Sequence, residues 1–268
     1  MVVVGVAVFF ISVGAFLTVN KNKSSAEKTD RGVSSPAVQE IYEQALTLKE
    51  NNEVPKAKEL LKQIVTEHPD FKDIDAAQKN LEELNLKTIF SGTETPDTVI
   101  HEVKSGDTLG KIAKQYNTTV ELIQKSNNLK GDTIRLGQRL RIWKGTFSVL
   151  VDKSQNILIL NSNNEVVKVY RVSTGADNNT PVGTFTIVNK LVDPVWFKSG
   201  AIIPPESPKN VLGTRWMGFD IPGYGIHGTV EPDAIGQQVT AGCVRMLNEE
   251  VEELYSLLPV GIKVTIVD

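Results

Sequence analysis

The chain has 268 residues, of which 40% are hydrophobic and 23% charged, with a formal net charge of -3. This length exceeds one typical domain, and the composition excludes a collagen-like or wholly disordered chain, so we expect two or three small domains. No basic stripe is dense enough to neutralise a run of phosphates, and we expect no nucleic-acid partner. The single cysteine excludes an intramolecular disulfide and leaves the redox compartment open.

The N-terminal segment has no charged side chain from Val2 to Val19. A run of about 18 apolar residues reaches the threshold for a membrane-spanning helix. A signal peptide would have a positive n-region and a nearby small-x-small cleavage site, and the sequence has neither. We therefore predict a transmembrane anchor or signal anchor at residues 1–19, with the membrane as its partner, and a linker at residues 20–35. Basic residues after the span favour a cytoplasmic body under the positive-inside rule, so the downstream domains must decide the orientation.

Residues 36–88 carry apolar side chains at helical spacing in three runs. Small residues at Ala45 and Ala57 would let the first two helices cross closely. Together with Pro69, where the second run ends, this helical pair resembles one tetratricopeptide unit. A single repeat buries little surface alone, so we expect it either to be capped by the third helix or to dock on a protein partner. A simple spacer bundle is the alternative.

After a linker at residues 89–98, residues 99–144 have the pattern of a strand–helix–helix–strand unit. Asp107 is placed to cap the first helix, and Thr118-x-x-Glu121 is placed as a capping box for the second. The segment resembles a lysin motif (LysM). This resemblance implies binding of N-acetylglucosamine-containing glycan strands such as those of peptidoglycan. The expected binding surface comprises Gly106, Asp107, Thr108, Leu109 and the loop before Leu136.

Residues 147–268 change to short alternating strands separated by turn signals. One late helix, with Asn248 expected as its cap, precedes a last strand at residues 262–267. The pattern predicts a mostly antiparallel β-sandwich with one late helix. The expected fold class is therefore multidomain, with a transmembrane helix, a small all-α hairpin, a βααβ LysM and this β-sandwich.

Two short motifs in the last segment carry the chemistry. IHGT at residues 226–229 contains His227, and TAGCVRM at residues 240–246 contains Cys243. An isolated thiol is often a small buried hydrophobe, but a neighbouring imidazole raises its thiolate fraction or takes its proton during attack. The motifs resemble the catalytic domain of YkuD-type L,D-transpeptidases, whose signature is a histidine followed by Ser/Thr-x-Gly-Cys-x-Arg. TPVGTF at residues 180–185 also resembles this family.

The resemblance implies a role for each residue around this pair. Cys243 is the expected nucleophile and His227 the general base and acid. The carbonyl of Gly228 would orient the imidazole, and the backbone at Gly242 would bind the oxyanion. The expected substrate-binding residues are Arg245, Thr240, Trp216 and Tyr224.

Some of these roles have alternatives. Arg245 would hold a stem-peptide carboxylate or form a structural ion pair. Trp216 and Tyr224 would line the substrate groove or fill the core. Many family members have Ser-His-Gly-Cys, whereas Ala241 stands here in place of that second histidine. A mechanism that uses the second histidine as its base is therefore not expected.

We expect a membrane-anchored peptidoglycan L,D-transpeptidase of the cell envelope, with an extracytoplasmic catalytic domain. By resemblance, Cys243 attacks the peptide bond before the terminal D-alanine of a tetrapeptide stem, and an amine of a second stem resolves the thioester. No cofactor is expected, and no metal site, because the three histidines are scattered along the chain. The alternatives are an L,D-carboxypeptidase of the same fold, with water as acceptor, and a non-catalytic peptidoglycan-binding scaffold.

Overall fold

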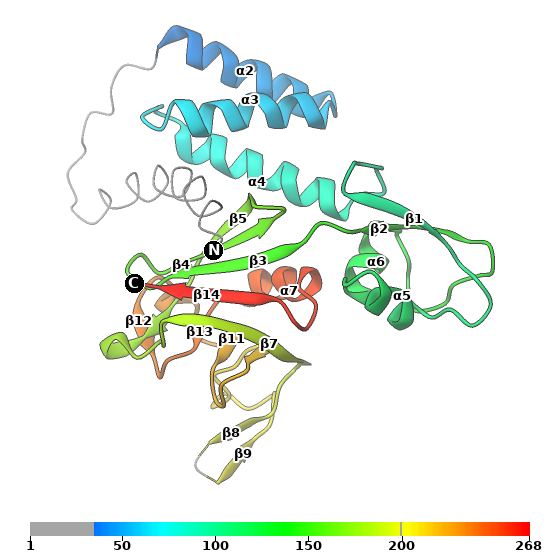
Figure 1. Ribbon diagram of the computed structural model, residues 1–268. Coiled ribbons are helices and arrows are strands. Elements are labelled where there is room, and N and C mark those ends of the chain that lie inside the picture. The colour runs from blue at the N-terminus through cyan, green and yellow to red at the C-terminus, as the bar shows by residue number, and fades with distance from the viewer. Residues whose placement is uncertain (1–34, 199) are drawn as a thin grey trace, which may run out of the picture. The chain divides into compact units, whose positions relative to one another are not determined.

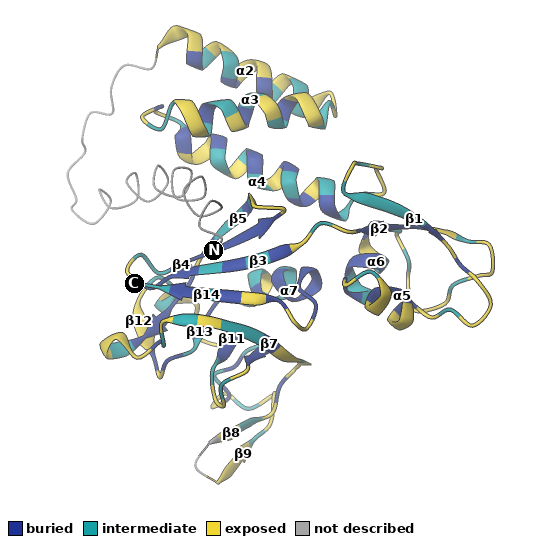
Figure 2. Cartoon of the chain, viewed as in Figure 1, coloured by how far each residue is buried: buried dark blue, intermediate teal, exposed yellow. Residues whose placement is uncertain are grey.

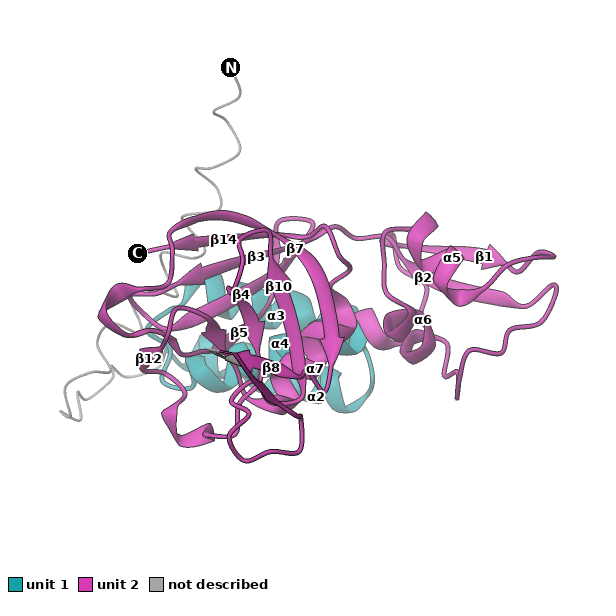
Figure 3. Cartoon of the chain, turned by 90° about the horizontal axis from the view of Figure 1, so that it is seen from below, with its two compact units in different colours: residues 1–88 teal, residues 89–268 magenta. Residues whose placement is uncertain are grey.

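The computed structural model describes residues 35–198 and 200–268 (Figure 1). The chain divides into two compact units, residues 1–88 and 89–268 (Figure 3). The membrane span expected at residues 2–19 lies outside the described residues. Within them, no helix is long and apolar enough to cross a membrane, which corrects the transmembrane element of the expected fold class. The longest described helix, α4, is amphipathic and carries charged side chains along its length.

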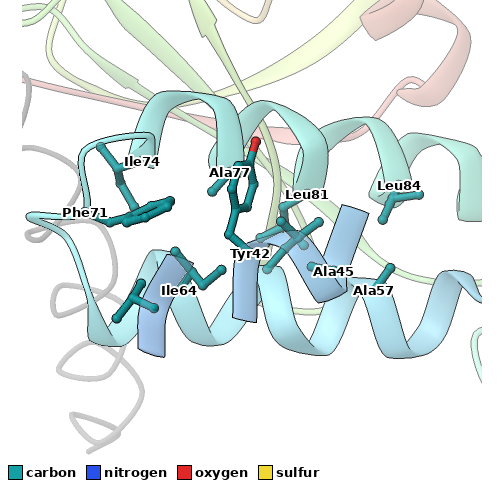
Figure 4. Close-up of a cluster of buried hydrophobic side chains, with 11 residues drawn as sticks. Tyr42, Ala45, Ala57, Ile64, Phe71, Ile74, Ala77, Leu81 and Leu84 are labelled. Atoms are coloured by element: carbon teal, nitrogen blue, oxygen red, sulfur yellow. The ribbon is translucent and has the colours of Figure 1, made fainter. Parts of the chain in front are cut away.

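From residue 35 onward, the first unit is built from the helices α2 (Pro36–Glu50), α3 (Val54–Glu67) and α4 (Ile74–Phe90). Helix α2 ends where Asn52 takes a left-handed backbone conformation, with φ 61°. Ala45 and Ala57 are fully buried, as their small size at a close helix crossing predicts. Side chains from all three helices form one core, so the third helix covers the hairpin (Figure 4). The resemblance to a tetratricopeptide unit and the protein partner remain predictions.

The second unit begins with a small strand–helix–helix–strand body. Its elements are β1 (Thr98–Glu102), α5 (Leu109–Gln115), α6 (Val120–Ser126) and β2 (Arg139–Trp143), with β1 and β2 antiparallel. The helix caps lie one residue later than predicted. Thr108 accepts a hydrogen bond from the Lys111 amide at 3.2 Å, and Thr119 accepts one from Leu122 at 2.9 Å. Asp107 instead accepts the Lys104 amide at 2.7 Å, which fixes the turn before α5.

The rest of the second unit is dominated by an eight-stranded sheet with the order β13-β11-β10-β7-β14-β3-β4-β5. The strands are β3 (Phe147–Asp152), β4 (Ile157–Ser162), β5 (Glu165–Arg171), β7 (Gly183–Val192), β10 (Arg215–Phe219), β11 (Gly225–His227), β13 (Val244–Arg245) and β14 (Lys263–Val267). Two-stranded ladders join β6 (Thr174–Gly175) with β12 (Gln238–Thr240), and β8 (Trp196–Lys198) with β9 (Ala201–Ile203). Most pairs are antiparallel, as predicted, but β11 with β13, β14 with β3 and β6 with β12 are parallel. Strand β4 is buried along its whole length (Figure 2).

This sheet is bent around helix α7 (Asn248–Leu257). The helix contacts β10 and β11 near one edge of the sheet. At the other edge, Glu253 of α7 accepts hydrogen bonds from Lys168 and Tyr170 of β5, at 2.7 and 2.8 Å. Both edges therefore reach the same helix, which requires strong curvature. The expected sandwich is thus one continuous bent sheet rather than two facing sheets.

The two edges of the sheet meet just beyond β5. Ser173 exchanges two backbone hydrogen bonds with Arg245 of β13, each 2.8 Å long. This bridge nearly closes the sheet on itself. It also fixes β13, a strand of only two residues, from the side opposite β11. The closure point therefore lies beside the segment that carries Cys243.

Candidate active site

The parallel pairing of β11 with β13 brings the two catalytic candidates together. Ile226 pairs with Val244, and His227 with Arg245. Because side chains alternate along a strand, Cys243 and Arg245 point to the same face as His227. Continuing the register places Gly225 opposite Cys243, so no side chain separates the thiol from the imidazole. His227 and Cys243 are therefore diagonal neighbours across the β11–β13 pair.

His227 is buried, with 3% of its surface exposed. Its Nδ1 atom lies 2.7 Å from the carbonyl oxygen of Gly228. A carbonyl can only accept, so Nδ1 carries the proton and Nε2 is left as an acceptor. Burial lowers the pKa of His227 to about 4, opposed by the Gly228 hydrogen bond and reinforced by the charge of Arg245. The imidazole is therefore neutral at pH 7.

Cys243 is half-buried and lies just before β13. Burial raises the pKa of its thiol, while the backbone amide of Gly225 and the positive charge of Arg245 act in the opposite direction. The Sγ atom donates to the Gly223 carbonyl oxygen at 3.4 Å. The thiol is therefore protonated at neutral pH, and the resting pair with His227 is uncharged.

The turn that precedes Cys243 is held together by the side chain of Thr240, its first residue. Thr240 Oγ1 donates to the Cys243 carbonyl at 2.7 Å and accepts from the Gly242 amide at 3.1 Å. Gly242 has φ 135°, and a Cβ there would lie 2.6 Å from the ring of Tyr224, so only glycine fits. The Gly242 N–H, expected to bind the oxyanion, thus already has a partner in the turn. Thr240, expected to contact substrate, is buried and braces this turn.

Arg245 is buried and forms an ion pair, while its Nε has no hydrogen-bond partner among the described residues. It is 7% exposed, and its Nη1 lies 2.8 Å from Glu231 Oε2. This is the ion-pair alternative considered from the sequence, with Glu231 the partner that the sequence did not reveal. Because Glu231 is largely exposed, solvent weakens the pair, and Arg245 still acts on the pKa values of His227 and Cys243.

The two aromatic candidates pack against different parts of the site. Trp216 on β10 stacks on the His227 ring, with centroids 6.0 Å apart and an interplanar angle of 21°. Its indole N–H donates to Asn189 Oδ1 at 3.0 Å. Tyr224 packs against Gly242, beside the nucleophile. Each aromatic residue therefore braces one catalytic candidate, and both are partly exposed.

A buried lysine, Lys153, holds a loop that packs against the turn at Gly242. Lys153 donates to the Thr180 carbonyl at 2.9 Å and pairs with Asp268 at 3.0 Å. It thereby holds the loop that starts at Gly175, where a Cβ would lie 3.0 Å from the Gly242 Cα. The TPVGTF motif pointed to this loop, but nothing in the sequence identified Lys153. Within residues 35–198 and 200–268, no three His, Cys, Asp or Glu side chains are grouped so as to hold a metal ion.

Comparison with known proteins agrees with this architecture. The L,D-transpeptidase catalytic domain (YkuD) family matches residues 146–266, and the LysM domain family matches residues 101–143. A relative named putative L,D-transpeptidase YqjB, from Bacillus subtilis, is 43% identical over 45% of this chain and 70% of its own length. Putative L,D-transpeptidase YkuD of the same organism is 33% identical over 62% of this chain and 97% of its own. The chain therefore belongs to the YkuD family of L,D-transpeptidases and carries a LysM domain.

Solved structures with a related fold include an X-ray crystal structure of an L,D-transpeptidase from Mycobacterium tuberculosis H37Rv. It is 18% identical, covers 50% of this chain and 63% of its own, and gives a TM-score of 0.41. A likeness this distant adds nothing to the family assignment.

The low pKa of His227 predicts a specific dependence of stability on pH. Below pH 6.5 the unfolded chain protonates this residue, whereas the folded chain does so only near pH 4. Its contribution to the free energy of unfolding is complete above about pH 6.5. As the pH falls to about 4, it should decrease by on the order of 3 kcal/mol. Urea unfolding of the parent and of His227→Gln, measured at several pH values, gives the free energy of unfolding of each protein as a function of pH.

The variant should lose less stability than the parent across this window. His68→Gln, which changes a partly exposed histidine of the other unit, is the matched control and should keep the parent slope. Equal slopes for His227→Gln and the parent would show that His227 is not held neutral by burial.

Proposed function

We propose that this chain is a peptidoglycan L,D-transpeptidase that joins stem peptides through a thioester on Cys243. The observation that carries the proposal is the placement of His227 and Cys243 on one face of the β11–β13 pair, in a chain of the L,D-transpeptidase family. The neutral resting state of the pair supports one of the two modes of activation considered from the sequence. In that mode, His227 takes the thiol proton during attack, and no preformed thiolate is needed.

In the first step, Cys243 Sγ bonds to the carbonyl carbon before the terminal D-alanine of the donor stem, and its proton passes to His227 Nε2. The imidazolium that forms is stabilised by the Gly228 carbonyl at Nδ1. His227 then gives the proton to the nitrogen of D-alanine as the peptide bond breaks, which leaves a thioester. In the second step, His227 takes a proton from the acceptor amine, the new amide forms, and the thiol leaves with that proton.

The developing oxyanion needs a donor other than the Gly242 amide, which is bound to Thr240. The amide of Cys243 itself is the better candidate, because the described part of the chain supplies no acceptor for it. The positive charge of Arg245 on the same face adds to this stabilisation. Arg245 thus favours the anionic intermediate without contacting a substrate carboxylate.

The acceptor decides between two outcomes of the same acyl-enzyme. An amine acceptor gives a crosslinked dimer, whereas water gives a trimmed monomer, as in an L,D-carboxypeptidase. Mass spectrometry of muropeptides after incubation with the purified protein distinguishes the two. If neither product forms and a carbapenem does not label the protein, only the role of a non-catalytic wall-binding scaffold is left.

Loss of the nucleophile should abolish the reaction without unfolding the protein. Cys243→Ala and Cys243→Ser should show no carbapenem adduct in intact-mass spectra and no crosslinked muropeptides, because the chain has no other thiol. Their melting temperatures should stay close to that of the parent, since Cys243 is only half-buried. Crosslinking that persists in either variant would exclude the proposed mechanism.

The role of His227 predicts the shape of the pH–rate profile. In the parent, the rate of acylation by a carbapenem should stay near its neutral value down to about pH 5 and fall below that, since Nε2 becomes protonated near pH 4. At pH 7, His227→Gln should be slower by a factor of about 10² to 10⁴. Its rate should rise with pH, because only the thiolate fraction then reacts. Stopped-flow acylation at constant ionic strength measures both profiles.

His68→Gln again serves as the control and should reproduce the parent profile. If His227→Gln acylates at nearly the parent rate at pH 7, another group activates Cys243 and the catalytic pair proposed here is wrong.

We also propose that the LysM domain brings the enzyme to its glycan-linked substrate, through the surface at Gly106, Asp107 and Thr108. Leu109, expected on this surface from the sequence, is 3% exposed and packs in the core of the LysM body. The family match at residues 101–143 supports this, and the rigid turn at Asp107 gives the surface a fixed shape. Tethering raises the local concentration of stems around the catalytic domain. Both proposals place the described domains outside the cytoplasm, which an active C-terminal alkaline phosphatase fusion would support and an inactive one would contradict.

Leu136 provides a direct test of glycan binding, since its side chain is 77% exposed in the loop that adjoins this surface. Leu136→Asp should weaken co-sedimentation with purified sacculi about tenfold, the loss expected for one apolar contact. Val188→Asp places the same charge on an apolar residue that is 47% exposed in the catalytic domain, and it should bind as the parent does. Equal binding by the parent and Leu136→Asp would show that the loop before Leu136 is not part of the glycan-binding site.

A further inference from the structure

We propose that Asn248, the first residue of α7, is a positioning residue that holds His227 in its reactive tautomer and orientation. The inference rests on the proposed function, since it assigns a part of the same catalytic machinery. Asn248 touches neither the imidazole nor the thiol in any described contact. Its action would pass through the backbone of Gly228 and Thr229, the two residues that follow His227.

The amide of Asn248 clamps both polar backbone groups of one residue. Its Oδ1 accepts the Thr229 N–H at 3.0 Å, and its Nδ2 donates to the Thr229 carbonyl at 2.8 Å. The same Oδ1 accepts the Thr214 N–H at 3.2 Å. One side chain thereby ties the segment after β11 to the segment before β10. All three hydrogen bonds of this amide go to backbone groups of these two segments.

The clamp acts on the peptide unit that orients His227. The peptide bond between Gly228 and Thr229 is planar and trans, so its C=O and N–H point in opposite directions. The N–H is bound by Asn248, and the C=O accepts from His227 Nδ1 at 2.7 Å. Rotation of this one plane would break both hydrogen bonds together. Asn248 therefore fixes the direction of the carbonyl that selects the tautomer of His227.

The surrounding backbone is shaped to admit this amide. A Cβ on Gly228 or on Gly213 would collide with Asn248 Oδ1. Gly213 also has φ 63°, a conformation that favours glycine. The glycine of the IHGT motif is thus needed to make room for Asn248 as well as to bring its carbonyl to His227.

The strand that carries the nucleophile is tied to the same place. The Met246 amide donates to the His227 carbonyl at 2.9 Å, two residues before Asn248 and three after Cys243. The residues from 243 to 248 therefore set the position of His227 at two points, at its own carbonyl and at the following peptide unit. A shift of about 1 Å between reacting groups is enough to cost on the order of a hundredfold in rate.

A capping role for Asn248 does not account for these contacts. The sequence suggested that it caps α7, but the helix begins at Asn248, its N-cap position is Leu247, and no side chain caps it. The hydrogen bonds of the asparagine amide therefore go to the loops beside His227 and not to the end of α7.

The test is a double-mutant cycle on carbapenem acylation. Asn248→Ala should slow acylation by about 10- to 100-fold in the parent background, the usual effect of losing an orienting partner. In the His227→Gln background it should slow acylation less than about threefold, because a histidine that is absent cannot be misplaced. An equal factor in both backgrounds, or no slowing in the parent, would overturn the proposal.

A second measurement does not depend on activity. ¹⁵N spectra of the imidazole rings report the tautomer, and the chain has only three histidines, so His227→Gln assigns the signal. The parent should show the Nδ1–H form at His227, and Asn248→Ala should show a mixture of tautomers. Unchanged His227 signals in Asn248→Ala would also overturn the proposal. If the parent is not acylated at all, the proposed function fails, while the spectra still test the positioning role.

Two further variants separate positioning from stability. Asn127 makes the same clamp in the LysM body, where it binds both the N–H and the C=O of Arg141, at 2.7 and 2.8 Å. Asn127→Ala should lower the melting temperature but leave acylation and the His227 signal unchanged. If Asn248→Ala does not fold, the isosteric Asn248→Asp keeps the acceptor for Thr229 N–H. Asn248→Asp should then slow acylation by a smaller factor, and this slowing should also disappear in the His227→Gln background. If Asn248→Asp slows acylation by the same factor in both backgrounds, the proposal is overturned.

Discussion

The parallel pairing of β11 with β13 is the constraint on which the site depends. Both strands are very short, three and two residues, and neither would be stable alone. The two strands stay paired because the bent sheet fixes them from both sides. Strand β10 pairs with β11, and the Ser173 bridge pairs with β13. Helix α7 fills the concave side of this bend. The distance between thiol and imidazole is therefore set by the closure of the whole sheet.

Burial governs the electrostatics of the pair more than any neighbouring charge does. It pushes the pKa of His227 down and that of Cys243 up, and both shifts favour the uncharged form. In the proposed mechanism, charge separates only when the thiol attacks, in a site whose dipoles are already oriented. The Gly228 carbonyl faces the imidazolium that forms, and Arg245 lies on the face where the anion forms. Such preorganised groups need no rearrangement at the moment of reaction.

Local patterns predicted much of this fold, and the sequence motifs singled out His227 and Cys243 as candidates, but neither predicted the contacts made by tertiary closure. Helix periodicity and turn signals located α2, α3, β3 and β4, because those signals lie within each segment. Asn248 was taken for a helix cap because a local rule fits it, whereas its amide is used across two distant loops. The partner of Arg245 could not be foreseen either, since Glu231 lies on a turn without a pattern. The arm formed by β8 and β9 escaped notice because its exposed Phe197 and Ile202 break the usual alternation.

The same closure explains how a single histidine can serve this site. Ala241 replaces the histidine that many family members carry beside the nucleophile, and it is exposed on the turn. An exposed imidazole there would keep an ordinary pKa and would have no fixed tautomer. His227, by contrast, is buried, stacked by Trp216 and bound at Nδ1, so its ring has a fixed orientation and its Nε2 is unprotonated. The proposed mechanism requires a base in a neutral form and a fixed orientation, and the contacts of His227 supply both without a second histidine beside it.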